Sequence, residues 1–377
     1  MFWLLYAITT CISVSFCWFG RRFVVAVLSF EQALADSSSC SKRHLLLGNG
    51  FSIACFPKIF HYGSLFSRAD FSGSPYLIDV FKSLGTEDFE IVIRHLEAAA
   101  KLVQVYLPKE DATAQKMKND AAKIKEVLLQ TIASNHPDYP GSVSEDKLLA
   151  CRKFLANFLT GNSAGQVFTL NYDLLLYWAL MHGEDEELTI KLKPNDGFGN
   201  DEDDPWADYV VWQGETGAHK AKVHFLHGAL HLYDAGNELQ KYTWVRTNDR
   251  LIDQARAAIE GNKFPIFVSE GSSNQKKQKI RHNAYLYQGF KQLTANAETG
   301  RHCFFVHGHS LDENDDHILK RLARGRFPKL YVSLFGDSSS QENKRIVHKA
   351  ESMAYERSDR YPLEVGFYDA ASAKPWG

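Results

Sequence analysis

Three histidines near the middle of the chain have the side chains best suited to proton transfer. His224, His227 and His231 lie in the segment VHFLHGALH, and His227 directly precedes Gly228 at the end of an apolar run. A neutral imidazole there can act as a general base. The spacing also suggests a metal site, but side chains alternate along a strand, so His224 and His227 face opposite ways. No carboxylate or cysteine completes the set nearby. We therefore expect a base and no bound metal.

A second group of polar side chains alternates at the end of another apolar run. Thr169, Asn171 and Asp173 lie in the segment TLNYD. Ligand-binding and catalytic groups cluster at the carboxyl ends of strands in open parallel sheets, so an amide and a carboxylate spaced in this way can face one pocket. The alternative is structural, because Asn171 or Asp173 can cap the helix that follows.

Two glycine turns follow further apolar runs, and each contains small residues: Gly48, Gly50 and Ser52 in the first, Gly308 and Ser310 in the second. Glycine lets the backbone approach a pyrophosphate or a ribose closely. The third glycine of the dinucleotide fingerprint is absent, so the first turn is also consistent with a plain strand-to-helix connection. Acidic residues and a histidine follow the second turn. They suggest a metal site, or acidic side chains favoured by the dipole of a helix.

Short apolar strands that alternate with helices must position these residues. The predicted strands are 42–47, 166–170, 223–226, 265–268, 303–306, 330–335 and 364–368. This alternation predicts an α/β fold with a largely parallel sheet. Apolar residues at helical spacing predict a helical insertion over 76–160, and polar composition predicts loop insertions over 184–222 and 271–300.

Composition excludes several classes of protein. The chain has 377 residues, of which 45% are hydrophobic, so it can bury a substantial core. The formal net charge of −2 gives no general electrostatic footprint for nucleic acid. The six cysteines form no C-x-x-C pair, which excludes a zinc ribbon, and we expect reduced thiols in the cytoplasm.

The N-terminal residues 1–24 stand apart from the rest. Residues 1–20 carry no charge and are followed by Arg21 and Arg22. About 20 apolar residues can span a bilayer, so the segment is either a membrane anchor or an extension that is not translated. A strand-then-helix pattern resumes at Val25, and we expect residues 1–22 to be dispensable for folding.

The four motifs, in this order, resemble those of the sirtuin-like superfamily. Sirtuins carry Gly-Ala-Gly-x-Ser, then Thr-Gln-Asn-x-Asp, then a catalytic His-Gly, then Gly-Thr-Ser. The matching stretches here are GNGFS, TLNYD, HG and GHS. The stretches GHSLDENDDHIL, PIFVSEGSSNQKKQKI and FYDAASAKPWG further resemble a bacterial family of sirtuin-like proteins long labelled as a domain of unknown function. Relatives of that family include NAD-degrading effectors of antiphage defence.

The resemblance implies that residues 25–377 form a Rossmann-type NAD-binding domain. It implies that Asn171 and His227 are the catalytic pair and that Asp173 supports the nicotinamide end of NAD+. It also implies a set of cofactor-binding residues in the turns and at the strand ends: Gly48, Asn49, Gly50, Ser52, Thr169, Gly308, His309, Ser310 and Gly336. NAD+ would then be the substrate.

Three activities follow as hypotheses. The first is an NAD+ glycohydrolase, which in a defence effector would need an activating protein partner or a homo-oligomer. The second is a protein ADP-ribosyltransferase or deacylase, although the four-cysteine zinc module of deacylating sirtuins is missing here. The third is a non-catalytic nucleotide-binding sensor.

Overall fold

The computed structural model describes most of the chain after residue 25. The described residues are 26–182, 192, 195–214, 221–236, 238–243, 249–261, 263–269 and 272–377. The apolar N-terminal segment therefore lies outside them, as do residues 184–191 of the first predicted loop insertion. Within the described ranges no helix is long and apolar enough to cross a membrane.

A seven-stranded sheet in which every strand pair is parallel forms the centre of the fold. Its order is β1-β11-β10-β9-β2-β3-β6. The strands are β1 (Val27–Leu28), β2 (Lys42–Leu47), β3 (Ala164–Thr169), β6 (Val223–Phe225), β9 (His302–His307), β10 (Lys329–Leu334) and β11 (Glu364–Asp369). The predicted α/β class with a Rossmann-type, largely parallel sheet is confirmed.

The strand order reverses next to β2. From β2 the chain adds β3 and β6 on one side, and it then returns to add β9, β10 and β11 on the other. In open α/β sheets ligands bind at such a switch point, outside the carboxyl ends of the strands. Here the switch point lies between β2 and β9.

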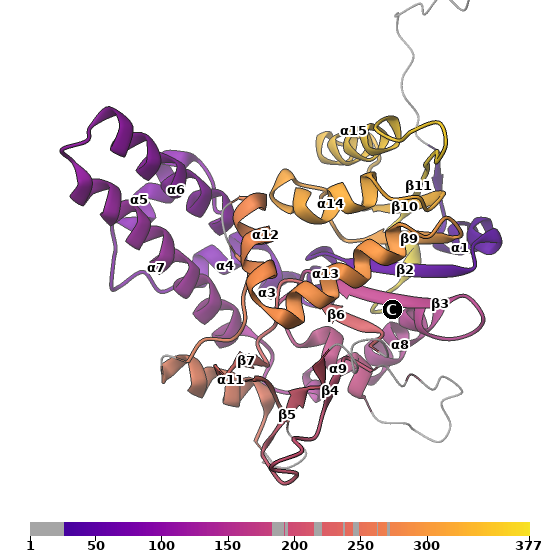
Figure 1. Cartoon of the computed structure of the whole chain (residues 1–377), viewed down its shortest axis with the longest axis horizontal. Coiled ribbons are helices and arrows are strands. Elements are labelled where there is room, and N and C mark those ends of the chain that lie inside the picture. The colour runs from indigo at the N-terminus through magenta and orange to yellow at the C-terminus, as the bar shows by residue number, and fades with distance from the viewer. Residues whose placement is uncertain are drawn as a thin grey trace, which may run out of the picture.

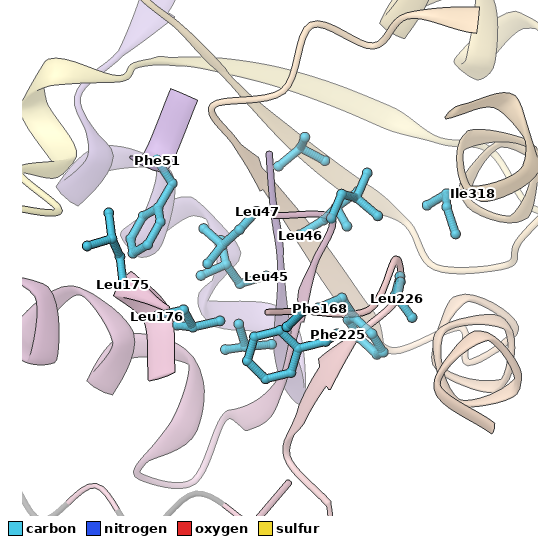
Figure 2. Close-up of a cluster of buried hydrophobic side chains, with 14 of the residues drawn as sticks. Leu45, Leu46, Leu47, Phe51, Phe168, Leu175, Leu176, Phe225, Leu226 and Ile318 are labelled. Carbon is cyan, nitrogen blue, oxygen red and sulfur yellow. The ribbon is translucent and has the colours of Figure 1, made fainter. Parts of the chain in front are cut away.

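Helices cover both faces of the sheet, which explains why consecutive residues of its central strands are buried, as in β2 and β9 (Figures 1 and 2). Phe305 of β9 packs against Phe158 of α8 (Glu145–Leu159), with ring centroids 5.3 Å apart. Phe304, the preceding residue, points to the other face and contacts Phe168 and Phe327. On that face α13 (Ala284–Ala297) packs on β6 and β9, and α15 (Gln341–Tyr355) packs on β10. The remaining helices beside the sheet are α1 (Phe30–Asp36), α9 (Leu175–Met181) and α14 (Asp316–Ala323).

The connection between β2 and β3 is helical, as predicted for 76–160, and the helices begin earlier, at Gly50. They are α2 (Gly50–Cys55), α3 (Pro57–Phe60), α4 (Tyr62–Arg68), α5 (Leu77–Leu84), α6 (Phe89–Tyr106), α7 (Asp111–Asn135) and α8. The α6 and α7 helices pair lengthwise and project beyond the sheet (Figure 1). Asp88 starts α6 by accepting hydrogen bonds from the amides of Glu90 and Ile91.

Both predicted loop insertions contain regular structure. The second insertion contains α12 (Ser273–His282) and α13, because Ser272 and Asn283 cap the two helices and Ile280 is buried between polar neighbours. The segment 184–222 contains β4 (Phe198–Gly199) and β5 (Tyr209–Trp212). These strands join β8 and β7 in a four-stranded antiparallel sheet of order β4-β5-β8-β7.

The other elements of this region are β7 (Leu232–Asp234), β8 (Leu239–Tyr242) and α11 (Leu251–Glu260). The predicted strand 265–268 is wrong. Its residues pair with the turn after β6 through a single bridge from Phe267 to Gly228, so they do not extend the large sheet.

Candidate functional site

The two glycine turns touch each other at the switch point. The Gly50 amide donates to the carbonyl oxygen of Gly308 over 2.8 Å, and the Gly48 amide donates to the carbonyl oxygen of His307 over 3.0 Å. A Cβ atom on Gly48 would lie 2.6 Å from the Gly308 oxygen, so the backbones leave no room for a side chain. Gly308 also has a φ of +66°, which favours glycine. The two glycine turns thus place backbone without side chains at the switch point, where open α/β sheets bind their ligands.

Asn171, Ser52 and Asp173 form one hydrogen-bonded cluster beside this turn. The Asn171 amide nitrogen Nδ2 donates to the Gly48 carbonyl over 3.0 Å and to Ser52 Oγ over 2.9 Å. Ser52 in turn donates to Asp173 Oδ2 over 2.5 Å, and Thr169 Oγ1 accepts from the Asn171 backbone amide. Both Nδ2 hydrogens of Asn171 are therefore used, and within the described ranges its Oδ1 is the side-chain atom left to meet a ligand.

Asp173 combines the two roles that its sequence position suggests. Its Oδ1 accepts from the amide of Leu175, the first residue of α9, from the position before the N-cap residue Leu174, while Oδ2 holds Ser52. Burial raises the pKa of Asp173, and the hydrogen bond from Ser52 opposes that rise. Asp173 thus acts on the site through Ser52 and Asn171.

His227 lies in the turn at the carboxyl end of β6, next to the strand that carries Asn171. Gly228 makes this turn possible: its φ is +84°, and a Cβ atom on it would lie 1.9 Å from the carbonyl oxygen of Ile266. The Tyr172 ring lies nearly parallel to the His227 imidazole, with centroids 6.3 Å apart. The predicted catalytic residues Asn171, Asp173 and His227 therefore follow the carboxyl ends of two adjacent strands, β3 and β6.

The three histidines of the motif have separate environments. The His224 ring stacks on Phe168, with centroids 5.0 Å apart, on the face that α13 covers. The His231 ring contacts Tyr177 and Phe225. The His227 ring contacts Tyr172 and His317 instead, so the three imidazoles do not meet at one point.

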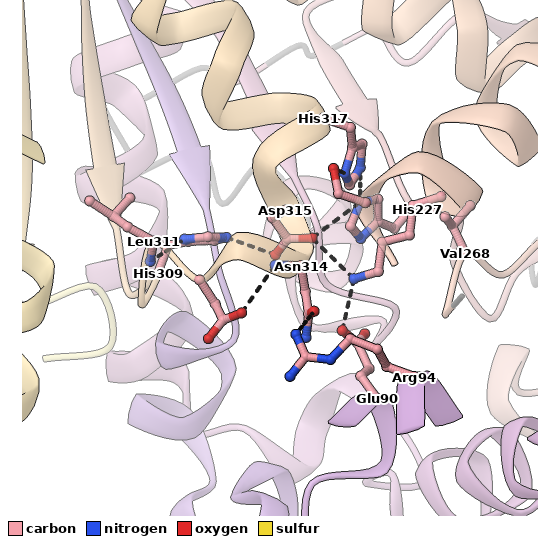
Figure 3. A network of polar contacts seen from close by, with 12 residues as sticks. Glu90, Arg94, His227, Val268, His309, Leu311, Asn314, Asp315 and His317 are labelled. Carbon is pink, nitrogen blue, oxygen red and sulfur yellow. Dashed lines mark hydrogen bonds and ion pairs between the residues drawn. The ribbon is translucent and has the colours of Figure 1, made fainter. Parts of the chain in front are cut away.

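A buried polar network surrounds His227 (Figure 3). Its Nε2 atom lies 3.0 Å from Nε2 of His317 and 3.9 Å from Oδ1 of Asp315. The Lys276 ammonium contacts Asp315 Oδ1 at 3.1 Å and Glu90 Oε2 at 2.7 Å, and its side chain is 1% exposed. His309 Nε2 lies 3.0 Å from Asp315 Oδ2.

Sequence reasoning missed most of this network. Asp315 and His317 follow the second glycine turn, where the acidic run is also explained by a helix dipole. Lys276 belongs to a basic run that reads as a surface loop, and no pattern distinguishes it from its neighbours Lys277 and Lys279. Glu90 lies in the first turn of α6, 186 residues away from Lys276.

The network is a possible ligand set for a metal, because donor atoms of His227, Asp315 and His317 lie within 4.8 Å of one another. The positive charge of Lys276 disfavours binding of a metal cation there, because the ammonium already pairs with the Asp315 carboxylate. The electrostatics therefore favour an ion-paired hydrogen-bond network at this place.

The other predicted cofactor-binding residues are distributed along the same edge of the sheet. Asn49 uses its side chain internally, donating to the Phe60 carbonyl over 3.0 Å. Ser310 is half-buried in the turn after β9, and Gly336 is exposed after β10, with a φ of +70°. A hollow of about 350 Å³ lies elsewhere, and the four motifs contribute no residue to its wall. It is bounded by 138–141, by α9 and its C-terminal neighbour His182, and by the start of α11.

Fold and site together define an α/β protein with a Rossmann-like parallel sheet and glycine turns at its switch point. A family model described as a domain of unknown function (DUF4917) matches residues 45–376. The chain therefore belongs to this family, and all four motifs lie inside the matched range. A search of curated proteins finds no match.

Proposed function

We propose that this protein is an NAD+ glycohydrolase of sirtuin-like type, which cleaves NAD+ to nicotinamide and ADP-ribose. The observation that carries the proposal is the convergence of four motifs on the carboxyl ends of four neighbouring strands, β9, β2, β3 and β6. The contact between the two glycine turns, at Gly48 and Gly308, supports it further, because bare backbone at a switch point suits a dinucleotide.

The proposed reaction breaks the bond between the ribose C1′ and the nicotinamide nitrogen. The bonding electron pair leaves with nicotinamide, and an oxocarbenium-like ribosyl cation develops, as in glycoside cleavage. Water attacks C1′, and the proton that it loses goes to His227. The products are nicotinamide, ADP-ribose and one proton.

Asn171 has the atom that this step needs. Its Nδ2 is held by Gly48 and Ser52, which leaves Oδ1 to accept a hydrogen bond from the attacking water or from a ribose hydroxyl. The amide does this without a charge that titrates. Ser52 and Asp173 orient it.

The His227 imidazole is suited to accept the proton because it is neutral. Burial lowers the pKa of His227 well below its usual value, although the Asp315 carboxylate opposes this effect. A positioned base of this kind contributes about 10²- to 10⁴-fold to a rate.

Product analysis tests the proposal against the other two activities. Purified protein is incubated with NAD+, alone and with an acylated peptide, and free nicotinamide and ADP-ribose are followed. Release of both without peptide supports the glycohydrolase. Release that requires peptide indicates a transferase or deacylase. NAD+ binding without turnover, both in the purified protein and in cells that have received the activating signal, indicates a sensor.

A role as a defence effector is part of the same proposal, with activation by a protein partner or by self-assembly. In cells that have received the activating signal, the wild-type protein then depletes NAD+, whereas variants of His227 and Asn171 do not.

A further inference from the structure

His317 of α14 is the nearest polar partner of His227, although the two residues are 90 positions apart in the chain. The two Nε2 atoms are 3.0 Å apart, and the rings lie nearly parallel, at 19°. Both side chains are buried, at 2% and 4% exposure. Figure 3 shows His317 facing His227 from the helix that follows the second glycine turn.

Burial determines how this pair shares hydrogen atoms. It lowers the pKa of His317 to about 4 and that of His227 well below its usual value. Both rings are then neutral near pH 7, so one Nε2 atom carries a hydrogen and donates it to the other. Nε2 of His227 is therefore engaged, and Nδ1 is the nitrogen left to face a substrate.

The contacts of His317 are satisfied in one of the two arrangements. Ser273 Oγ lies 3.5 Å from Nδ1 of His317, and a hydroxyl oxygen can accept a hydrogen there. The neutral His317 ring then carries its hydrogen on Nδ1 and accepts at Nε2. In this arrangement His227 donates from Nε2, which leaves a lone pair on Nδ1.

Asp315 provides a fixed negative charge beside this pair. Its Oδ2 accepts from Nε2 of His309, whose Nδ1 accepts from the Leu311 amide over 2.8 Å, so His309 has a single tautomer. Burial raises the pKa of Asp315, but Lys276 and His309 outweigh this effect and hold it well below its usual value. The carboxylate lies 3.9 Å from His227 Nε2, where it can stabilise the imidazolium that forms when His227 accepts a proton.

We propose that His317 is a positioning residue for the glycosidic cleavage: it accepts the Nε2 hydrogen of His227 and so keeps Nδ1 of His227 as the base. Asp315, held by Lys276, stabilises the resulting cation. This proposal rests on the proposed NAD+ hydrolysis. It assigns the proton lost by water to Nδ1 of His227, from which it passes to solvent.

Two substitutions separate positioning from packing. His317→Phe keeps a ring but removes both nitrogens, whereas His317→Gln keeps an oxygen that can accept from His227. We expect His317→Phe to lower kcat by about 10- to 100-fold with little change in KM, by analogy with metal-binding histidines, where loss of the partner that orients the ring costs this much. We expect His317→Gln to restore most of kcat. His348→Gln, at an exposed position of α15, is the matched control and should match the wild type.

Imidazole nitrogen NMR of the folded protein tests the tautomer without any turnover. In the wild type we expect His227 to carry its hydrogen on Nε2 and His317 on Nδ1. In His317→Phe the His227 signals should shift to a mixture of tautomers. A His227 ring protonated on Nδ1 overturns the proposal, as does a folded His317→Phe enzyme with the wild-type kcat.

Failure of the proposed function is distinguishable from failure of this inference. A wild-type protein that releases no nicotinamide but shows the expected tautomers contradicts the hydrolase and supports the arrangement. Tight stoichiometric binding of Zn²⁺ that is lost in His317→Phe overturns the proposed role of His317, because Nε2 of His227 and Nε2 of His317 would then be metal ligands.

Discussion

Gly48 and Gly308 lie in direct backbone contact at the switch point of the sheet, although they are 260 residues apart in the chain. A Cβ atom on Gly48 would lie 2.6 Å from the Gly308 carbonyl oxygen and 2.8 Å from the His309 Cα atom. The contact joins the turn after β2 to the turn after β9. It therefore connects the Asn171 cluster, which holds the Gly48 carbonyl, to the His309 end of the polar network.

We predict that Gly48→Ala destabilises the protein and disrupts NAD+ binding. The added methyl group must displace backbone on both turns, and overpacking of this kind costs about 1–3 kcal/mol. Urea unfolding and NAD+ titration measure the two effects. Gly73→Ala is the control, because a Cβ atom at Gly73 meets nothing within 4 Å. Equal stability of the two variants would contradict this explanation.

The C-terminal residues stabilise the first glycine turn through Trp376. Its Nε1–H donates to the Phe51 carbonyl over 2.8 Å, and its ring contacts the Phe51 ring. We predict that Trp376→Phe lowers the free energy of unfolding by about 1–3 kcal/mol, because a buried carbonyl loses its donor. Trp206→Phe, at a position that is 88% exposed, should be nearly neutral in the same denaturant titration. A neutral Trp376→Phe would show that the tail does not hold the turn.

Buried histidines should make the fold sensitive to acid. Burial lowers the pKa of His136, His307 and His317 to about 4 and that of His224 to about 3. The unfolded chain, with a histidine pKa of about 6.5, then binds more protons than the folded state between these values. The contribution of these neutral histidines to the free energy of unfolding is therefore fully present above about pH 6.5, and it is lost as the pH falls towards 4.

Each such histidine contributes up to about 1.4 kcal/mol per pH unit in this window. Asp88, Glu90 and Asp173, whose pKa values burial raises, act in the opposite direction but are fewer than the buried histidines. Melting temperatures measured from pH 7.5 to 4.5 should fall steadily. A melting temperature that is constant or rises on acidification would contradict the burial of these imidazoles.

The sequence allowed the parallel sheet to be predicted because it depends on local pattern, and the same pattern predicted that Asn171 and Asp173 can face one pocket. The hydrogen bonds that join these two residues to Ser52 come from the tertiary fold. Strands such as KRHLLL end in an apolar run, and Asn171 and Asp173 follow their strand by fixed offsets. The helices at 273–297 were missed, because their polar surface outweighs the few buried residues that make them pack. The partner of His227 was missed for another reason: His317 comes from a distant helix, and only the tertiary fold brings the two imidazoles together.

The most direct test of the central claim compares wild type, His227→Ala and Asn171→Ala for NAD+ binding and nicotinamide release. We expect His227→Ala to stay folded and bind NAD+ while its release rate falls by about 10²- to 10⁴-fold, because the imidazole acts on a proton in the transition state. We expect Asn171→Ala to lose release as well, with weaker binding. His95→Ala, an exposed position on α6, should release nicotinamide at the wild-type rate. A wild type that releases none, both when purified and in cells that have received the activating signal, or a folded His227→Ala that releases it at the wild-type rate, would contradict the account.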